Sequence, residues 1–403
     1  MPAPEMPPSA LDGYRILDIT QGVAGPYCTK LLADYGAEVI KVEPPSGDRG
    51  RREGPFANDD PSAGEGALFL YLNTNKKSVT LDIAEPSGAA VLRRLAASSH
   101  LLISDWRPAD LAALGLDYES LRTANPKLAM LSLSYYGESG PYAGWVANNL
   151  TSFATGGQMA MTGDADREPL KPGGYQADYQ LGLNGFSAAT VALFDLEMHG
   201  EGQYCEVANI EAMASTLEAS LSTAAYTGTN LWRGRRGNIM SSLIGIYPAA
   251  DGYIGVHAMP RNWKALVETM GQPELAEDPR FSTAQARLQN EDDLRATLYA
   301  WSVGQNKREV YQRAGSLRGP VAYVHDMEDL FTSPHVRDRG YLVEVDHPDA
   351  GTLTYPRGPF TMSETPWIAG RAPLLGEHTV EVLTTLAGLS EDDIAVLHGA
   401  GIV

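Results

Sequence analysis

The sequence predicts an α/β protein with a Rossmann-like large domain built on a parallel sheet and a smaller α+β domain. Three observations support this fold class. The opening segment from Gly13 to Glu43 joins a short β-rich run, a glycine turn, a helical stretch and a second apolar run. Strand-like and helix-like patterns then alternate over roughly the first 200 residues, which is typical of a parallel sheet. Further along, this alternation gives way to a hairpin followed by helices.

The opening segment has the parts of a mononucleotide-binding unit. Its turn holds Gly22 and Gly25, and the helix that follows offers backbone N–H groups to a phosphate. Ala24 and Tyr27, however, stand where the G-x-G-x-x-G pattern requires its second and third glycines. The segment therefore indicates nucleotide-type architecture, and the failed pattern argues against an NAD-dependent oxidoreductase.

The other elements of the large domain follow from local patterns. SVTLDI alternates as a strand does, HLLIS and LAMLSLS are apolar runs typical of buried parallel strands, and Pro86 suits the first turn of a helix. Gly200 and Gly202 end a long, mostly apolar helix. In order, the predicted elements are strand Arg15–Ile19, helix Ala24–Tyr35, strand Glu38–Val42, strand Ser78–Ile83, a helix from Glu85 to about Ala97, strands His100–Ser104 and Leu128–Ser134, a helix within Gly173–Gln203, strand Tyr204–Ile210 and helix Glu211–Tyr226.

A second domain is predicted for residues 227–335, and the chain then returns to the first. The large domain accordingly comprises residues 1–226 and is completed by residues 340–403. In order, the elements predicted beyond residue 226 are a hairpin over Ile244–Ala258, helices Trp263–Met270, Leu288–Val303 and Lys307–Ala314, strand-like pieces Tyr341–Asp346 and Gly351–Tyr355, and a helix after LLGEHT.

The composition argues against several kinds of partner. A net charge of -19 and a pI near 4.8 would repel nucleic acid, and no apolar run reaches the length that a membrane helix needs. Two cysteines, Cys28 and Cys205, favour a reducing, cytoplasmic setting. The eight histidines are scattered without metal-ligand spacing, so no metal is expected.

An acidic protein that binds an anionic ligand must gather basic residues locally. The alternative for each such cluster is an ordinary solvated loop. The candidate clusters are Arg49, Arg51 and Arg52, then Lys76 and Lys77, and finally Arg233, Arg235 and Arg236.

Asp178 is the main candidate for chemistry. It lies between a glycine-rich loop and the start of the apolar helix, where backbone N–H groups and the helix dipole favour a carboxylate. One interpretation is an ordinary helix N-cap, and the other is a covalent nucleophile or a proton-transfer base. No G-x-S-x-G nucleophile elbow occurs, and Cys28 in the first helix is expected to be a core thiol.

From Leu11 to the C-terminus, the chain resembles the class III CoA-transferases, the family of formyl-CoA transferase and carnitine CoA-transferase. The matches occur in order, with spacings like those of the family. They are Gly13–Thr20, Ala24–Pro26, Leu32–Glu43, Gly47-Asp48, Leu72-Asn73, Asn75–Ser78, Leu81-Asp82, Thr155–Gly157, Ala177-Asp178, Gly202-Gln203, Ala372-Pro373 and Leu375–Thr379.

The resemblance implies an enzyme that moves CoA from an acyl-CoA to a free carboxylic acid, without metal or NAD. It implies a homodimer whose subunits interlock like linked rings. It also implies that Asp178 attacks the thioester, forming first an aspartyl anhydride and then an aspartyl-CoA thioester. The CoA-contacting positions that it implies are Val23, Ala24, Leu81, Asp82, Ile83, Ala84, Asp105, Trp106 and Arg107.

Four positions depart from formyl-CoA transferase. Pro44 and Ala113 stand where that enzyme has arginine, Asp105 replaces an asparagine, and Asn149 replaces an active-site glutamate. In place of its glycine-rich closing loop the chain has RGRRGN at Arg233–Asn238. These differences bear on the formyl and oxalyl substrates more than on the fold or the use of CoA.

Two alternatives remain within the same superfamily. An acyl-CoA racemase pairs the equivalent aspartate with an upstream histidine, but the matching segment Trp145–Leu150 contains none, which favours transfer. The other alternative is a CoA-ester-binding homologue without catalytic activity.

Overall fold

A six-stranded parallel sheet organises the first compact unit of the chain. The computed structural model describes residues 9–56, 59–61, 65–163, 166–217, 219–229 and 244–403. The strand order β3-β2-β1-β4-β5-β6 is that of a doubly wound sheet, and every neighbouring pair is parallel. The strands are β1 (Arg15–Asp18), β2 (Glu38–Glu43), β3 (Lys77–Thr80), β4 (Leu101–Ser104), β5 (Ala129–Ser134) and β6 (Tyr204–Ala208).

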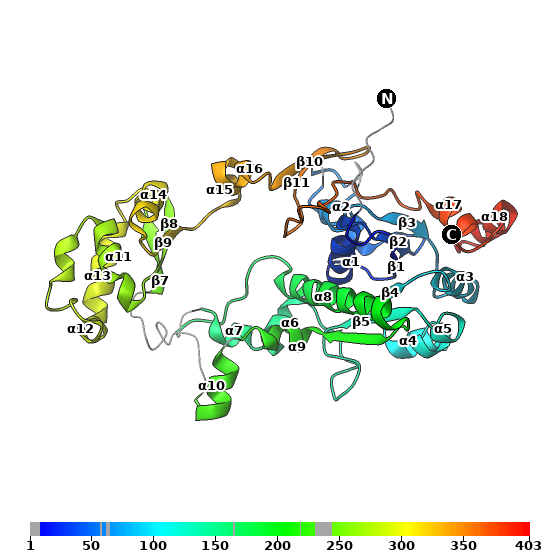
Figure 1. Cartoon of the computed structure of the whole chain (residues 1–403), viewed down its shortest axis with the longest axis horizontal. Helices are drawn as coiled ribbons and strands as arrows, with labels where there is room; N and C mark the ends of the chain where they lie inside the picture. Colours follow the sequence, from blue (N-terminus) through cyan, green and yellow to red (C-terminus); the bar gives the residue numbers. More distant parts are fainter. Residues whose placement is uncertain (1–8, 57–58, 62–64, 164–165, 218, 230–243) are drawn as a thin grey trace. The chain divides into compact units, whose positions relative to one another are not determined.

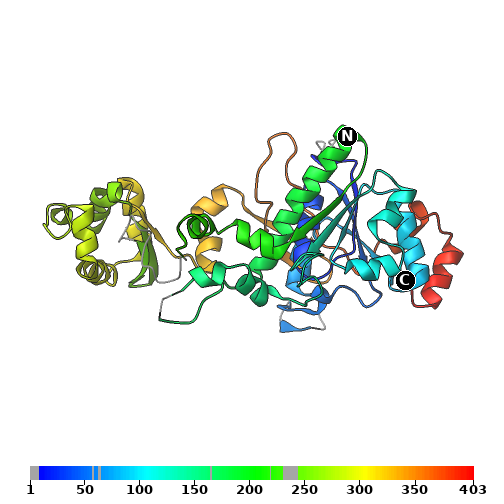
Figure 2. The same ribbon diagram turned by 90° about the horizontal axis from the view of Figure 1, so that it is seen from below.

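Helices cover both faces of this sheet (Figures 1 and 2). Because successive side chains of a strand point to opposite faces, Ile16 and Leu17 belong to different cores. The core containing Ile16 is completed by α1 (Ala24–Asp34) and α8 (Gln176–His199). The core containing Leu17 is completed by α3 (Pro86–Ala96), α4 (Pro108–Ala113), α5 (Tyr118–Ala124), α17 (Thr379–Thr385) and α18 (Glu391–Gly399).

The C-terminal segment packs against β3 and the residues that follow it. The N–H of Asp82 donates to the carbonyl oxygen of Ile402 at 2.7 Å, and the N–H of Thr80 donates to Oγ1 of Thr379 at 3.0 Å. Residues 1–159, 171–222 and 340–403 form this first unit. Its further elements are α2 (Ala67–Leu72), α6 (Asn149–Thr155), α9 (Asn209–Ser215) and the antiparallel pair β10 (Leu342–His347) and β11 (Gly351–Pro356).

The second compact unit comprises residues 160–170 and 223–339. It is a three-stranded antiparallel sheet with a helical layer and its own core around Phe281 and Leu298. Two helices, α7 (Gln158–Met161) and α10 (Ala219–Thr227), span the boundaries between the units. The elements of the second unit are β7 (Ile244–Ala249), β8 (Gly252–His257), α11 (Trp263–Met270), α12 (Ala284–Gln289), α13 (Glu291–Ser302), α14 (Lys307–Leu317), β9 (Val321–Tyr323), α15 (Met327–Thr332) and α16 (Pro334–Asp338).

The structure confirms the predicted α/β class and corrects several elements. The strand predicted at Ser78–Ile83 is Lys77–Thr80, and the helix predicted at Glu211–Tyr226 is two helices, α9 and α10. Strand β9 was not predicted, because three residues are too short a run to show a period of two. The Arg233–Asn238 stretch lies outside the described residues. No described helix has both the length and the apolar character that a membrane crossing needs.

A buried network of charges lies where β1 and β2 end. Asp18 and Lys41 are neighbours in the register of these strands, and Nζ of Lys76 lies 3.1 Å from Oδ2 of Asp18. Nζ of Lys41 contacts Oδ2 of Asp48 at 2.7 Å and donates to the carbonyl oxygen of Thr20 at 3.0 Å. Burial alone would raise the pKa of Asp18, but Lys76 and Lys41 lower it below its usual value. Burial also lowers the pKa of Lys76 to about 8, against the opposing effect of Asp18.

Replacing Lys76 with methionine is expected to destabilise the first unit strongly. The substitution leaves Asp18 without its closest cation, and breaking a buried ion pair in this way costs about 3–5 kcal/mol. Lys77 is a matched control, because it forms half-exposed ion pairs with Glu38 and Glu381. Lys77→Met should cost less than about 1 kcal/mol. Urea unfolding followed by circular dichroism measures both, and equal losses would contradict the role given to the buried network.

Candidate active site

A large cavity lies at the carboxyl ends of β1, β4 and β5. Its volume is about 1500 Å³, more than a drug-sized ligand requires, which suits a long molecule such as a nucleotide thioester. In a doubly wound sheet this edge is where ligands bind. All of its described lining belongs to the first unit: residues 21–25, Arg49, Glu53, 105–110, 132–138, 143–150, Lys171, Gly174, Tyr175, Asp178 and Leu181.

The turn after β1 is shaped by two close approaches. Gly22 has a φ of 82°, and a Cβ at this position would lie 2.5 Å from Nη2 of Arg49, so glycine lets the guanidinium lie against the turn. At the start of α1, a Cβ on Gly182 of α8 would lie 2.5 Å from the carbonyl oxygen of Ala24. The glycine turn and α8 therefore share one wall of the cavity.

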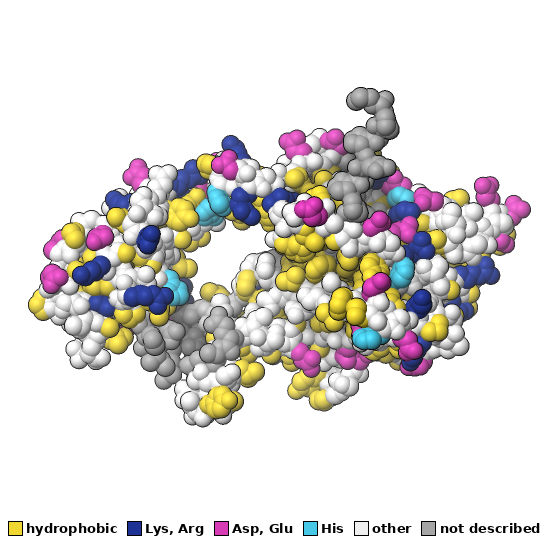
Figure 3. All heavy atoms as spheres, in the orientation of Figure 1, with side chains coloured by type: hydrophobic (Ala, Val, Ile, Leu, Met, Phe, Trp, Pro, Cys, Tyr) yellow, Lys and Arg dark blue, Asp and Glu magenta, His cyan; other side chains and the backbone are white. Residues whose placement is uncertain are grey.

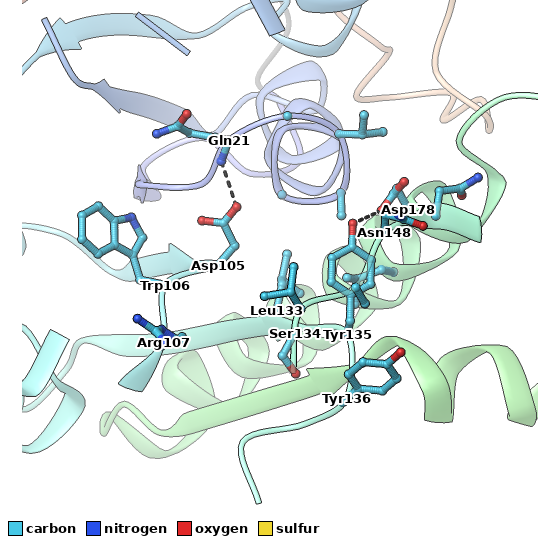
Figure 4. A pocket seen from close by; sticks show the side chains of 18 of the residues that line it. Gln21, Asp105, Trp106, Arg107, Leu133, Ser134, Tyr135, Tyr136, Asn148 and Asp178 are labelled. Carbon is cyan, nitrogen blue, oxygen red and sulfur yellow. Dashed lines mark hydrogen bonds between the residues drawn. The ribbon is translucent and has the colours of Figure 1, made fainter. Parts of the chain in front are cut away.

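Asp178 lies in the first turn of α8 and not at its N-cap. Tyr175 is the N-cap residue, so Asp178 is the third helical residue, and the N-cap interpretation was wrong. Its side chain is 4% exposed, and its Oδ1 accepts a 2.6 Å hydrogen bond from the hydroxyl of Tyr135 (Figure 4). No described residue donates a hydrogen bond to Oδ2. One carboxylate oxygen is thus held in place while the other has no donor among the described residues.

The electrostatic setting of Asp178 makes it less acidic than an exposed aspartate. Burial raises the pKa of Asp178, whereas the Tyr135 hydrogen bond and the positive charge of Arg49 lower it in part. Burial also raises the pKa of Tyr135, and the negative charge of Asp178 adds to that shift. Tyr135 is therefore a neutral hydrogen-bond donor at neutral pH and well above it.

Asn149 connects the glycine-rich loop to the helix that carries Asp178. Its Nδ2 donates to the carbonyl oxygen of Gly174 at 2.9 Å, and its Oδ1 accepts from the N–H of Ala177 at 2.9 Å. The amide satisfies one of the N–H groups that the first turn of a helix leaves unpaired. A glutamate, found here in formyl-CoA transferase, cannot make the first of these two contacts while ionised.

The predicted positions Asp105, Trp106 and Arg107 follow β4 and line the same cavity (Figure 4). Oδ2 of Asp105 accepts from the N–H of Gln21 at 3.1 Å, and Nε1 of Trp106 donates to the carbonyl oxygen of Ile19 at 3.2 Å. Arg107 makes an exposed ion pair with Asp110. The pKa of Asp105 is raised to about 6, because the protein atoms around its carboxylate make the charged form less favourable. The residue is nevertheless exposed to solvent in the cavity.

The basic candidates separate into two groups. Arg49 and Arg107 line the cavity, and no hydrogen bond or ion pair joins Arg49 to another described residue. Arg51 is buried against Glu43, and Lys76 against Asp18, so neither is free to bind a phosphate. Two other sets of predicted residues lie outside the described lining of the cavity. One is Lys77, which forms ion pairs with Glu38 and Glu381. The other follows β3 and comprises Leu81, Asp82, Ile83 and Ala84.

Glu43 is the last residue of β2 and has a structural role. Its carboxylate is buried and accepts hydrogen bonds from Arg51, from Ser78 and from the N–H of Asp48. Cys28 is fully buried, and burial raises the pKa of its thiol, as expected of a core cysteine. No group of His, Cys, Asp and Glu among the described residues has the arrangement of a metal site.

Sequence reasoning placed the loop that begins at Tyr135 near the substrate, but it singled out neither Tyr135 nor Gln21 as a site residue. Both follow strands whose carboxyl ends form the ligand-binding edge of the sheet. That rule, applied to the strands already predicted, would have found Tyr135 directly after LAMLSLS. The Tyr135–Asp178 contact itself joins residues 43 positions apart and has no local sequence signal.

The chain that forms this sheet and cavity belongs to a known enzyme family. The family model for CoA-transferase family III matches residues 11–379, and the chain belongs to that family. It is a class III CoA-transferase, an enzyme that transfers CoA between acyl-CoA thioesters and carboxylic acids.

Relatives and solved structures agree with this assignment. The chain is 34% identical to succinyl-CoA--D-citramalate CoA-transferase of Chloroflexus aurantiacus, over 99% of each sequence. It is 32% identical to succinate--glutarate CoA-transferase of Agrobacterium fabrum, over 93% of this chain and 95% of that one. A CaiB/BaiF family protein from Brucella suis has a TM-score of 0.84 at 29% identity, with 94% of this chain and 99% of that chain covered.

The pKa of Asp105 predicts a pH-dependent repulsion of CoA. Above about pH 6 the carboxylate is charged and would oppose the phosphates of a CoA bound at the position that the resemblance implies, whereas below that pH it is increasingly neutral. Asp105→Asn should therefore bind CoA several-fold more tightly at pH 7.5, by on the order of 1 kcal/mol. At pH 5 the variant and the wild type should bind equally. Calorimetric titration at both pH values tests this, and an affinity ratio that does not change with pH would contradict it.

Proposed function

We propose that Asp178 is the covalent nucleophile of the transfer reaction. The observation that carries this proposal is the position of its carboxylate, which is buried in the cavity wall with no donor to Oδ2 among the described residues. A nucleophile must be ionised, and the first turn of α8 favours a negative charge. Arg49 also favours the ionised form.

The transfer proceeds through four exchanges at carbonyl groups. Asp178 attacks the acyl carbon of the donor, the C–S bond breaks, and CoA leaves as a thiolate, which gives an aspartyl anhydride. The thiolate attacks Cγ of Asp178 and releases the donor acid. The acceptor carboxylate then attacks Cγ and expels the thiolate. Finally the thiolate takes the new acyl group and restores the carboxylate. No water or metal takes part, so the cavity needs only to hold CoA while the acids exchange.

The CoA-binding part of the cavity is assigned to the turn after β1 and the loop after β4. Val23 and Ala24 offer backbone groups at the start of α1, and Asp105, Trp106 and Arg107 line the cavity next to this turn. Arg49 and Arg107 offset the acidic surface near the phosphates. Contacts from Leu81 to Ala84 with the adenine remain part of the proposal through the resemblance alone.

The acids exchanged are proposed to be small dicarboxylic acids. Relatives at 32–34% identity are named for succinyl-CoA or succinate together with citramalate, glutarate or mesaconate. Formyl-CoA:oxalate CoA-transferases match at 29–30% identity.

Racemisation is not supported by the cavity. The segment Trp145–Leu150 lines it beside Asp178, since Asn149 bonds to the N–H of Ala177, and it carries no histidine or other titratable base. A two-base proton relay needs a second group within reach of the substrate proton.

We also propose the interlocked homodimer, together with a large CoA-binding domain over residues 1–226 and 340–403 and a small domain over 227–335. The outer face of α8 supports an association surface, since Leu183, Val191, Phe194 and Met198 of this helix are exposed. Figure 3 shows hydrophobic side chains at the surface in this part of the first unit. The two free cysteines are consistent with a cytoplasmic location.

Replacing Asp178 with asparagine should abolish transfer and leave the fold intact. The amide cannot form an anhydride, so kcat should fall by about 10³-fold or more. Asparagine still accepts the Tyr135 hydrogen bond, and the stability should change by about 1 kcal/mol or less. Asp117→Asn is the control, because Asp117 caps α5 away from the cavity and asparagine caps equally well. Exchange of CoA between succinyl-CoA and glutarate, followed by mass spectrometry, measures both, and near wild-type turnover in Asp178→Asn would refute the nucleophile.

The dimer proposal predicts one sedimenting species of twice the chain mass at micromolar concentration. An interlocked dimer cannot separate without unfolding, so dilution into the nanomolar range should leave it unchanged. An active monomer in analytical ultracentrifugation would contradict this proposal.

A further inference from the structure

The hydroxyl of Tyr135 makes the two oxygens of Asp178 inequivalent. It donates to Oδ1 at 2.6 Å, and Figure 4 shows the phenol directed at the aspartate from the end of β5. Oδ2 receives no hydrogen bond from a described residue. The bonds made and broken in the proposed transfer do not involve this hydroxyl, so the contact can change only the rates of the steps.

We propose that Tyr135 is a catalytic residue that stabilises the negative charge formed on Oδ1 each time Cγ of Asp178 is attacked. This inference rests on the covalent role proposed for Asp178. It assigns Oδ2 as the attacking oxygen and Oδ1 as the oxygen that stays on the enzyme throughout a turnover.

The balance of the reaction shows where this donor acts. In the first step Oδ2 bonds to the acyl carbon and CoA leaves as a thiolate, so Oδ1 becomes the carbonyl oxygen of an anhydride and loses negative charge. When the thiolate then adds to Cγ, the electron pair of the Cγ–Oδ1 double bond moves onto Oδ1. The double bond re-forms as the Cγ–Oδ2 bond breaks, and the donor acid leaves with that oxygen. Addition of the acceptor carboxylate to Cγ passes through the same oxyanion, and the thiolate leaves.

The hydrogen bond therefore affects the steps unequally. At both additions to Cγ, charge develops on the atom that the Tyr135 hydroxyl contacts, and one such donor contributes about 10²–10³-fold in rate. In the first step the same bond stabilises the attacking carboxylate, so its loss does not slow that step. Tyr135 suits this work because its raised pKa keeps it protonated while the anion forms.

The test separates formation of the aspartyl-CoA thioester from its resolution. The wild type and Tyr135→Phe are each mixed with succinyl-CoA, and the succinate that is released is then removed. Glutarate is added next, and the CoA bound to the protein is followed over time by intact-protein mass spectrometry. The variant should resolve its thioester about 100-fold more slowly, with KM for succinyl-CoA nearly unchanged. The acidic limb of its pH–rate profile should move to higher pH, because Asp178 loses the hydrogen bond that lowers its pKa while Arg49 remains.

Tyr118→Phe is the matched control. Like Tyr135→Phe, it removes a tyrosine hydroxyl that donates a hydrogen bond. The acceptor in this case is the backbone carbonyl of Gly202 at 2.9 Å, and Tyr118 lies outside the described cavity lining. If Tyr135→Phe does not fold, 3-fluorotyrosine at position 135 replaces it, since its more acidic phenol is a stronger donor and should speed resolution. Resolution within about threefold of wild type in Tyr135→Phe, or no gain with fluorotyrosine, overturns the role of Tyr135. Absence of any CoA adduct on the wild type instead overturns the covalent role of Asp178.

Discussion

The two buried ion pairs Asp18–Lys76 and Lys41–Asp48 are the constraint on which the site depends. Four charged groups are enclosed where β1 and β2 end, and each must be satisfied by its partner or by nearby polar groups of the chain. In satisfying them, the chain fixes the glycine turn after β1: Lys41 holds the carbonyl of Thr20, and Asp48 accepts the N–H of Gly22. Because α8 packs against the start of α1, where a side chain on Gly182 would meet the carbonyl of Ala24, the same constraint sets the position of Asp178.

The nucleophilic role that we propose for Asp178 places two opposed requirements on its carboxylate. It must be ionised to attack a thioester, and it must be dry enough that water does not compete for the anhydride. Burial supplies the dryness and raises the pKa of Asp178, while Tyr135 and Arg49 hold that rise in check. Asn149 keeps the glycine-rich loop joined to the first turn of α8, so the carboxylate is presented from a rigid helix rather than from the loop.

Much of the fold was readable from the sequence because parallel strands buried on both faces appear as short apolar runs, as at Leu101–Ser104. Helix Trp263–Met270 was predicted with its observed bounds, whereas the short strand β9 left no periodic signal. Asp178, the candidate singled out from the sequence, lines the cavity, but its place in the first turn depends on where the loop enters the helix. Arg51 and Lys76 looked like phosphate ligands, and only tertiary structure shows that carboxylates already occupy them.

In the mechanism that we propose, CoA becomes covalently joined to the enzyme through Asp178. The most direct measurement is to add hydroxylamine during turnover with succinyl-CoA and to map the modified peptide by mass spectrometry. A hydroxamate at Asp178, formed only when both acyl-CoA and hydroxylamine are present, is the result expected. Rapid transfer with no modified carboxylate in the peptide that contains Asp178 would contradict the covalent mechanism, because CoA would then pass between the two acids without an aspartyl intermediate.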